Sequence, residues 1–142
     1  MEDVARREGD VVITSSSEET DERERELVNT LLSRQVEGLL LVPAASDHGY
    51  LRPELAMGMQ VLVLDRPPGG LDADAALIDN AGVSRDGVEH LLAHGPHRIG
   101  LIGDPLGLYT LDERVAGYRS ALEAAVVLEA ELVVRGSGEV SR

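Results

Sequence analysis

Short apolar runs rich in Val, Leu and Ile alternate with longer segments of helical period along the chain. Most of these runs lack an alternation of apolar and polar residues, which is typical of parallel β-strands covered on both faces. The runs predict strands at 11–14, 38–42, 61–64, 75–78, 99–102 and 132–134. Strands that alternate with helices indicate βαβ units with right-handed crossovers, so the predicted fold class is α/β with a parallel sheet.

Helical periodicity is clearest over 111–125. Apolar side chains recur there at spacings of 4, 3, 4 and 3, through Leu111, Val115, Tyr118, Leu122 and Ala125. Thr110 and Glu113 have the spacing of a capping box, which predicts that Thr110 caps this helix. An amphipathic helix is predicted over 20–34, a shorter and weaker one over 50–57 and another over 84–93, and 1–8 has the pattern of a helix end.

The chain carries 13 basic and 26 acidic residues, a formal net charge of -13, and no cysteine. Nucleic-acid binding rests on Lys and Arg, so this charge argues against such binding by these residues alone. The acidic stretch 18–26 is typical of a solvated helix face. The absence of cysteine excludes disulfides and fits a reducing compartment. Because apolar runs such as 39–42 are far too short to span a membrane, we expect a soluble, cytoplasmic protein without a membrane partner.

Candidate site residues follow the predicted strands, because ligands of open parallel sheets bind beyond the carboxyl ends of the strands. These positions are 15–17, 43, 65–66, 79–80 and 103–114. Their carboxylates can accept hydrogen bonds from sugar hydroxyls, and a guanidinium donates a planar pair to oxygens. The pattern therefore suits a polyol or another small polar ligand, although Asp residues after strands also commonly cap the next helix or turn.

Other site chemistries have little support in the sequence. His90 and His94 lie four residues apart on a predicted helix, but no third ligand is evident, so no metal site is predicted. The glycine-rich stretches lack the spacing of phosphate-binding loops, and there is no nucleophile elbow. No cofactor and no catalytic residue are predicted. An enzyme that uses Asp65 and Asp79 as acid and base is the weakest of the functional hypotheses.

Six sequence motifs succeed one another along the chain. The first three are LLSRQVEGLLLVP at 31–43, VLVLDR at 61–66 and IDN at 78–80. The others are GVEHLLAHG at 87–95, RIGLIG at 98–103 and ERVAGYRSAL at 113–122. In this order and spacing the chain resembles the effector-binding core of the lactose-repressor (LacI/GalR) family over nearly its whole length.

The resemblance implies a two-lobed, periplasmic-binding-protein-like fold, incomplete at both ends. Residues 1–80 would belong to the N-terminal lobe, with its first strand missing, and residues 81–142 to the first part of the C-terminal lobe. A sugar-like effector would bind between the lobes of a homodimer, and operator DNA would contact a helix-turn-helix outside this chain. A solute-binding component of a sugar transporter shares this fold and is the alternative.

The resemblance also assigns effector contacts to individual residues. They are Asp65, Thr110 and Arg114. Asp79 is a weaker candidate, because its alternative role is to steady the crossover between the lobes. A helix N-terminus with an Arg one turn in suits an oxygen-rich ligand. The missing strand would lie between 11–14 and 38–42 and would leave both without a shared partner.

Overall fold

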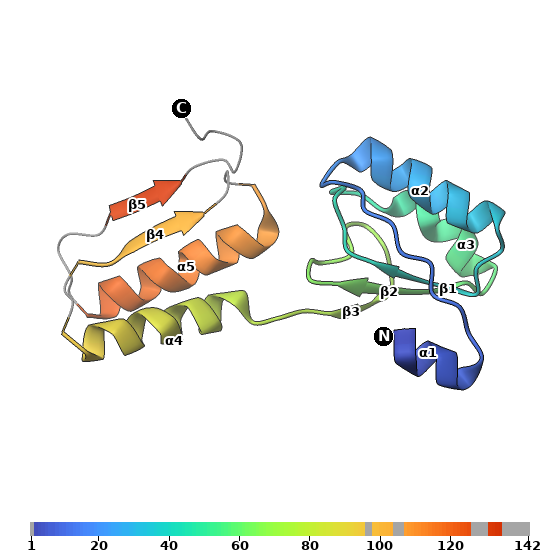
Figure 1. The fold of residues 1–142 in the computed structure, drawn as a ribbon. Coiled ribbons are helices and arrows are strands. Elements are labelled where there is room, and N and C mark those ends of the chain that lie inside the picture. The colour runs from blue at the N-terminus through green and yellow to red at the C-terminus, as the bar shows by residue number, and fades with distance from the viewer. Residues whose placement is uncertain (1, 96–97, 104–106, 126–130, 135–142) are drawn as a thin grey trace, which may run out of the picture. The chain divides into compact units, whose positions relative to one another are not determined.

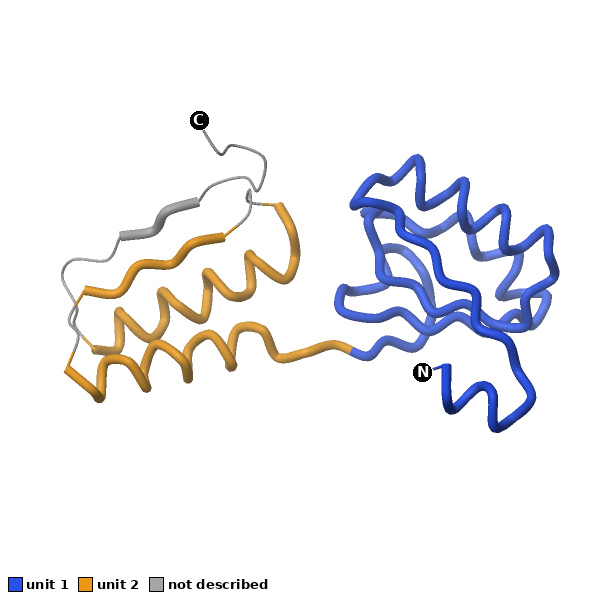
Figure 2. The backbone as a smooth tube through the Cα atoms, in the orientation of Figure 1, with its two compact units in different colours: residues 1–76 blue, residues 77–142 orange. Residues whose placement is uncertain are grey.

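The computed structural model describes residues 2–95, 98–103, 107–125 and 131–134. The chain divides into two compact units, residues 1–76 and 77–142 (Figure 2). Each unit combines helices with a small parallel sheet, as Figure 1 shows, so the predicted α/β class is confirmed. Within the described ranges, no helix is both long enough and apolar enough to cross a membrane.

The sheet of the first unit has three parallel strands in the order β1-β2-β3. They are β1 (Gly38–Leu41), β2 (Gln60–Leu64) and β3 (Asp74–Ala76). The helices of this unit are α1 (Glu2–Glu8), α2 (Asp21–Ser33), the 3-10 helix η1 (Gly49–Leu51) and α3 (Arg52–Ala56). The predicted helix 50–57 is thus present as η1 and α3.

The core of the first unit is aliphatic. Its buried members are Val28, Leu39, Leu41, Leu51, Val61, Val63 and Leu71. On β1, Leu39 and Leu41 are buried, whereas Leu40 is 48% exposed. The prediction that the strands are covered on both faces is therefore wrong for β1, because the core that covers it lies on one side only.

The apolar run 11–14 forms no strand, so that prediction is wrong as well. Val11 is 88% exposed and Ile13 is 48% exposed. A strand exists only when its backbone groups pair with a neighbour, and β1 lies at the edge of the sheet with β2 as its described partner. Within the described residues no strand pairs with 11–14, and its apolar side chains remain at the surface.

The second unit consists of two helices and a two-stranded parallel sheet. These elements are α4 (Asn80–Ala93), β4 (Gly100–Gly103), α5 (Tyr109–Ala124) and β5 (Glu131–Val134). The register pairs Gly100 with Glu131. Val88, Tyr118, Ala121 and Leu122 form the core. The Tyr118 hydroxyl donates to the Ile99 carbonyl at 2.6 Å, which ties α5 to the start of β4.

The helix boundaries differ from the predicted ones at their N-terminal ends. Helix α4 begins at Asn80, four residues before the predicted start, and α5 begins two residues before it. The added residues, 80–83 in α4 and 109–110 in α5, do not extend the repeat of apolar side chains. The helical periodicity of the sequence therefore did not reveal them. Of the predicted site residues of the second unit, Asp79 is the N-cap of α4 and Thr110 lies in the first turn of α5.

Candidate functional site

Asp79 fixes the N-terminal end of α4. Its Oδ1 accepts a hydrogen bond from the Gly82 amide at 2.8 Å, the usual N-cap arrangement. A Cβ at position 82 would lie 2.2 Å from Asp79 Oδ2, so a larger residue there would displace the capping carboxylate. Asp79 therefore has a structural task at this helix end, and its contact with an effector stays a prediction.

Asn80 orients the side chain of Arg114. Asn80 is 4% exposed, and its Oδ1 accepts a hydrogen bond from Arg114 Nε at 2.8 Å. Its Nδ2 donates to the Ile78 carbonyl at 3.3 Å. Because Nε is the inner nitrogen of the guanidinium, the two outer nitrogens keep their donors free of any partner in the described part of the chain. Arg114 is thus an exposed, oriented fork of donors suited to an oxygen-rich ligand.

A close approach of α5 to α4 sets the position of Arg114. Gly117, one turn further along α5, lies against α4, and a Cβ at Gly117 would be 2.0 Å from the Ala81 carbonyl oxygen. The Ser84 hydroxyl also donates to the Arg114 carbonyl at 2.7 Å. These two contacts fix the spacing of the helices at the level of Asn80 and Arg114.

Thr110 lies in the first turn of α5 and is half-buried. The prediction that it caps this helix is wrong, because Leu108 occupies the N-cap position and no side chain caps α5. The Leu108 carbonyl already accepts the amides of Leu111 and Asp112 at 3.0 and 2.9 Å, so the helix starts before the capping box. Thr110 lies four residues before Arg114 and therefore shares a helix face with it.

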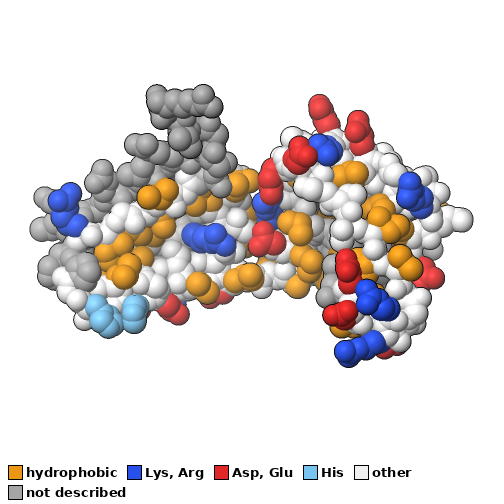
Figure 3. Space-filling view, in the orientation of Figure 1, with side chains coloured by type: hydrophobic (Ala, Val, Ile, Leu, Met, Phe, Trp, Pro, Cys, Tyr) orange, Lys and Arg blue, Asp and Glu red, His pale blue; other side chains and the backbone are white. Residues whose placement is uncertain are grey.

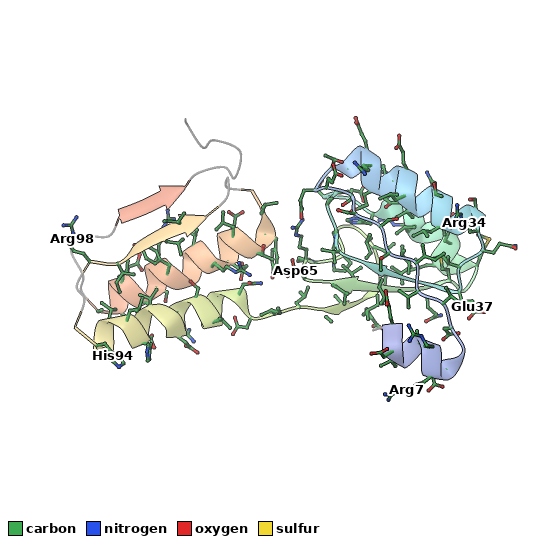
Figure 4. All side chains as sticks on the ribbon, viewed as in Figure 1. Arg7, Arg34, Glu37, Asp65, His94 and Arg98 are labelled. Atoms are coloured by element: carbon green, nitrogen blue, oxygen red, sulfur yellow. The ribbon has the colours of Figure 1, made fainter. Side chains whose placement is uncertain are left out.

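Asp65 follows β2 in the first unit (Figure 4). Its φ of 69° is left-handed, a conformation that Asp tolerates better than most residues with a side chain. The neighbouring Arg66 donates to the Pro43 carbonyl at 2.7 Å and to both Glu19 carboxylate oxygens, and the hydrogen bond to Glu19 raises the pKa of Arg66. Arg66 therefore joins the loops after β1 and β2, whereas the Asp65 side chain is 37% exposed.

Glu24 of α2 is buried, so the prediction of a solvated face is wrong for this residue. Its carboxylate accepts the amides of Ala44 and Ala45 at 2.5 and 3.3 Å and the Tyr50 hydroxyl at 3.1 Å. The fully buried His48 places Nε2 2.9 Å from Glu24 Oε1, but without the alignment of a hydrogen bond. The carboxylate thus ties α2 to the loop that follows β1.

Alkaline pH is expected to weaken this network through Tyr50. Burial and the neighbouring Glu24 carboxylate raise the pKa of Tyr50. The folded chain therefore holds the phenolic proton more tightly than the unfolded chain, and the resulting stability is lost as the pH rises above about 10. The gap in unfolding free energy between the wild type and Tyr50→Phe should narrow between about pH 8 and about pH 11. Urea denaturation at both pH values measures this gap, and a constant gap would contradict the assignment.

Comparisons with known proteins relate this chain to transcription regulators. No protein-family model matches the chain. It is 32% identical over 125 residues to the probable HTH-type transcriptional regulator EndR of Paenibacillus polymyxa, covering 86% of this chain and 37% of that protein. The crystal structure of a putative ribose operon repressor from Burkholderia thailandensis matches with 36% identity and a TM-score of 0.78, covering 94% of this chain and 49% of that one.

A LacI transcriptional regulator from Lactobacillus brevis has the same fold, with a TM-score of 0.83 at 18% identity, covering 99% of this chain and 52% of that one. The chain is similar to LacI-type transcription regulators. It spans about half the length of these solved LacI/GalR-type chains. The relatives matched are named as transcriptional regulators rather than enzymes.

The predicted effector contacts are distributed over both units. Thr110 and Arg114 lie on one helix of the second unit, and Asp79 caps the helix beside it. Asp65 belongs to the first unit. The positioning role of Asn80 was not predicted, although the IDN motif of the LacI/GalR resemblance contains this residue. The roles of Glu24 and His48 had no signal in any of the motifs.

Proposed function

We propose that the chain is the effector-binding part of a LacI/GalR-type transcription regulator, and that its effector is a sugar or a related small polar molecule. The similarity to LacI-type regulators supports the regulator function, and the solved relative with 36% identity is named as a putative ribose operon repressor. The observation that carries the ligand class is Arg114, which Asn80 holds at 2.8 Å so that its outer nitrogens face no protein acceptor in the described residues.

The effector contacts we propose are Asp65, Thr110 and Arg114. A carboxylate accepts sugar hydroxyls, while the guanidinium and the threonine hydroxyl donate to oxygens. The proposed lobes are residues 1–80 and 81–142. In this proposal Asp79 holds the start of α4, next to Asn80. It is a weaker candidate for an effector contact.

The proposed partners follow from the regulator function. Operator DNA would be bound by a segment of the complete protein other than these residues, whose net charge of -13 opposes contact with phosphates. The regulator would act as a homodimer in the cytoplasm. A sugar-transport component with the same fold is less well supported, because the relatives that resemble the chain are named as regulators.

Replacing Arg114 by alanine in the complete protein tests the proposal. A charged hydrogen bond is worth about 1.5–3 kcal/mol, so sugar affinity should fall about tenfold to a hundredfold. Calorimetric titration with D-ribose and a panel of other pentoses and hexoses measures the loss. Arg85→Ala is the matched control, because Arg85 is exposed on α4 and its ion pairs with described residues are to Asp86 and Glu89, at 3.6 and 3.9 Å.

The two parts of the proposal fail separately in this experiment. If no sugar binds the wild-type protein, the effector class is wrong. If a sugar binds Arg114→Ala as tightly as the wild type, the effector class stands and the site assignment is wrong.

A further inference from the structure

Two histidines lie together at the C-terminal end of α4. His90 and His94 are four residues apart, both are exposed, and their ring centroids are 4.4 Å from each other. Figure 3 shows histidine side chains gathered on the surface of the second unit, and Figure 4 places His94 at the end of α4. The pair lies at the C-terminal end of α4, whereas Asp79 and Asn80 lie at its N-terminal end.

A hydrogen bond to the backbone determines which ring nitrogen of His94 is available to bind a metal. His94 Nδ1 lies 2.7 Å from the His90 carbonyl oxygen. A carbonyl only accepts, so Nδ1 carries the proton and Nε2 keeps its lone pair. Metal-ligating histidines are commonly oriented in this way, with one ring nitrogen donating to a carbonyl and the other binding the metal. The His90 ring has no hydrogen-bond partner within the described ranges, so it is free to turn toward the same cation.

The electrostatic surroundings favour a cation at this position. The C-terminus of a helix carries partial negative charge, and His94 is the C-cap of α4. The chain as a whole has a formal net charge of -13. The carboxylates of Asp86 and Glu89 on the same helix add negative charge and lie 3.6 and 3.9 Å from Arg85 nitrogens.

We propose that His90 and His94 form a two-imidazole binding site for a divalent late transition-metal cation such as Zn²⁺, Ni²⁺ or Cu²⁺. Imidazole pairs four residues apart on a helix bind such cations, and Cu²⁺ is the tightest in the general order. The sequence argued against a metal because no third ligand was evident. Water completes the coordination of a two-imidazole site, and no general base lies between the histidines as it does in metalloproteases, so the site binds rather than catalyses.

Zinc chloride alone is the probe for this site. Titration of the 142-residue chain, followed by long-range ¹H–¹⁵N spectra of the imidazoles, should show His90 and His94 shifting together with Nε2 of His94 as the ligand. His90→Ala and His94→Ala should each weaken Zn²⁺ binding at least about tenfold, since a single imidazole remains.

His97→Ala is the matched control, since it removes a histidine close in sequence to the pair. It should leave the affinity for Zn²⁺ within about twofold and the shifts of His90 and His94 unchanged. Wild-type affinity in His90→Ala or His94→Ala, or ligation through Nδ1 of His94, would overturn the proposal. Saturation without any shift of the two imidazoles would also overturn it, because the cation would then be bound elsewhere.

Discussion

Replacing Glu24 by alanine is expected to lower the free energy of unfolding by about 3–5 kcal/mol. The substitution removes a carboxylate that is 2% exposed and accepts the amides of Ala44 and Ala45 and the Tyr50 hydroxyl. Each group left buried without a partner costs about 1–3 kcal/mol, and the shortened side chain leaves a cavity as well. Urea denaturation followed by circular dichroism measures the loss.

Glu26→Ala is the control for this prediction. Glu26 lies on the same helix but is exposed, so its removal should change the unfolding free energy by no more than about 0.5 kcal/mol. Amide hydrogen exchange adds a local measurement, because Ala44 and Ala45 should lose protection in Glu24→Ala and keep it in Glu26→Ala. Equal effects of the two substitutions would show that the buried network does not hold the loop.

Gly117→Ala is expected to destabilise the second unit by about 3 kcal/mol, the upper end of the range for overpacking. The added Cβ would lie 2.0 Å from the Ala81 carbonyl oxygen. That atom belongs to the backbone of α4, so the two helices have to separate. The separation should also lengthen the 2.8 Å contact between Asn80 and Arg114, so sugar affinity of the complete protein should fall together with stability.

Gly87→Ala, on the neighbouring helix α4, is expected to have the opposite effect on stability. A Cβ at Gly87 meets no atom within 4 Å. Alanine is favoured over glycine in a helix by about 0.5–1 kcal/mol, so this variant should be slightly more stable than the wild type. Thermal melts and sugar titration of both variants distinguish steric contact from a general effect of removing glycine. A similar loss in both would contradict the close approach of the helices.

The elements that were predicted correctly are those with a local signal. The repeat through Leu111, Val115 and Tyr118 marks α5 because an apolar helix face needs only its own sequence to be visible. The run 11–14 has the composition of a strand, but pairing depends on a neighbour that composition cannot supply. The Thr110 capping box failed for a similar reason, because the Leu108 carbonyl decides where the helix begins.

A sequence motif can suggest a candidate site residue, but it does not show a role that depends on burial. Arg114 is a candidate because of its motif, whereas the contact that orients it comes from Asn80, 34 residues earlier. Glu24 belongs to an acidic stretch, and only the fold shows that this one carboxylate turns inward to amides 20 and 21 residues away. Contacts at such separations leave no periodic trace in a sequence.

Asn80 has two hydrogen-bond partners that belong to different parts of the second unit. Its Oδ1 accepts from Arg114, and its Nδ2 donates to Ile78, in the short segment that follows the boundary between the units. A ligand whose affinity depends on the orientation of Arg114 is therefore thermodynamically linked to the conformation of that segment. By reciprocity, the free energy with which such a ligand biases the segment equals the free energy with which the segment tunes the ligand's affinity.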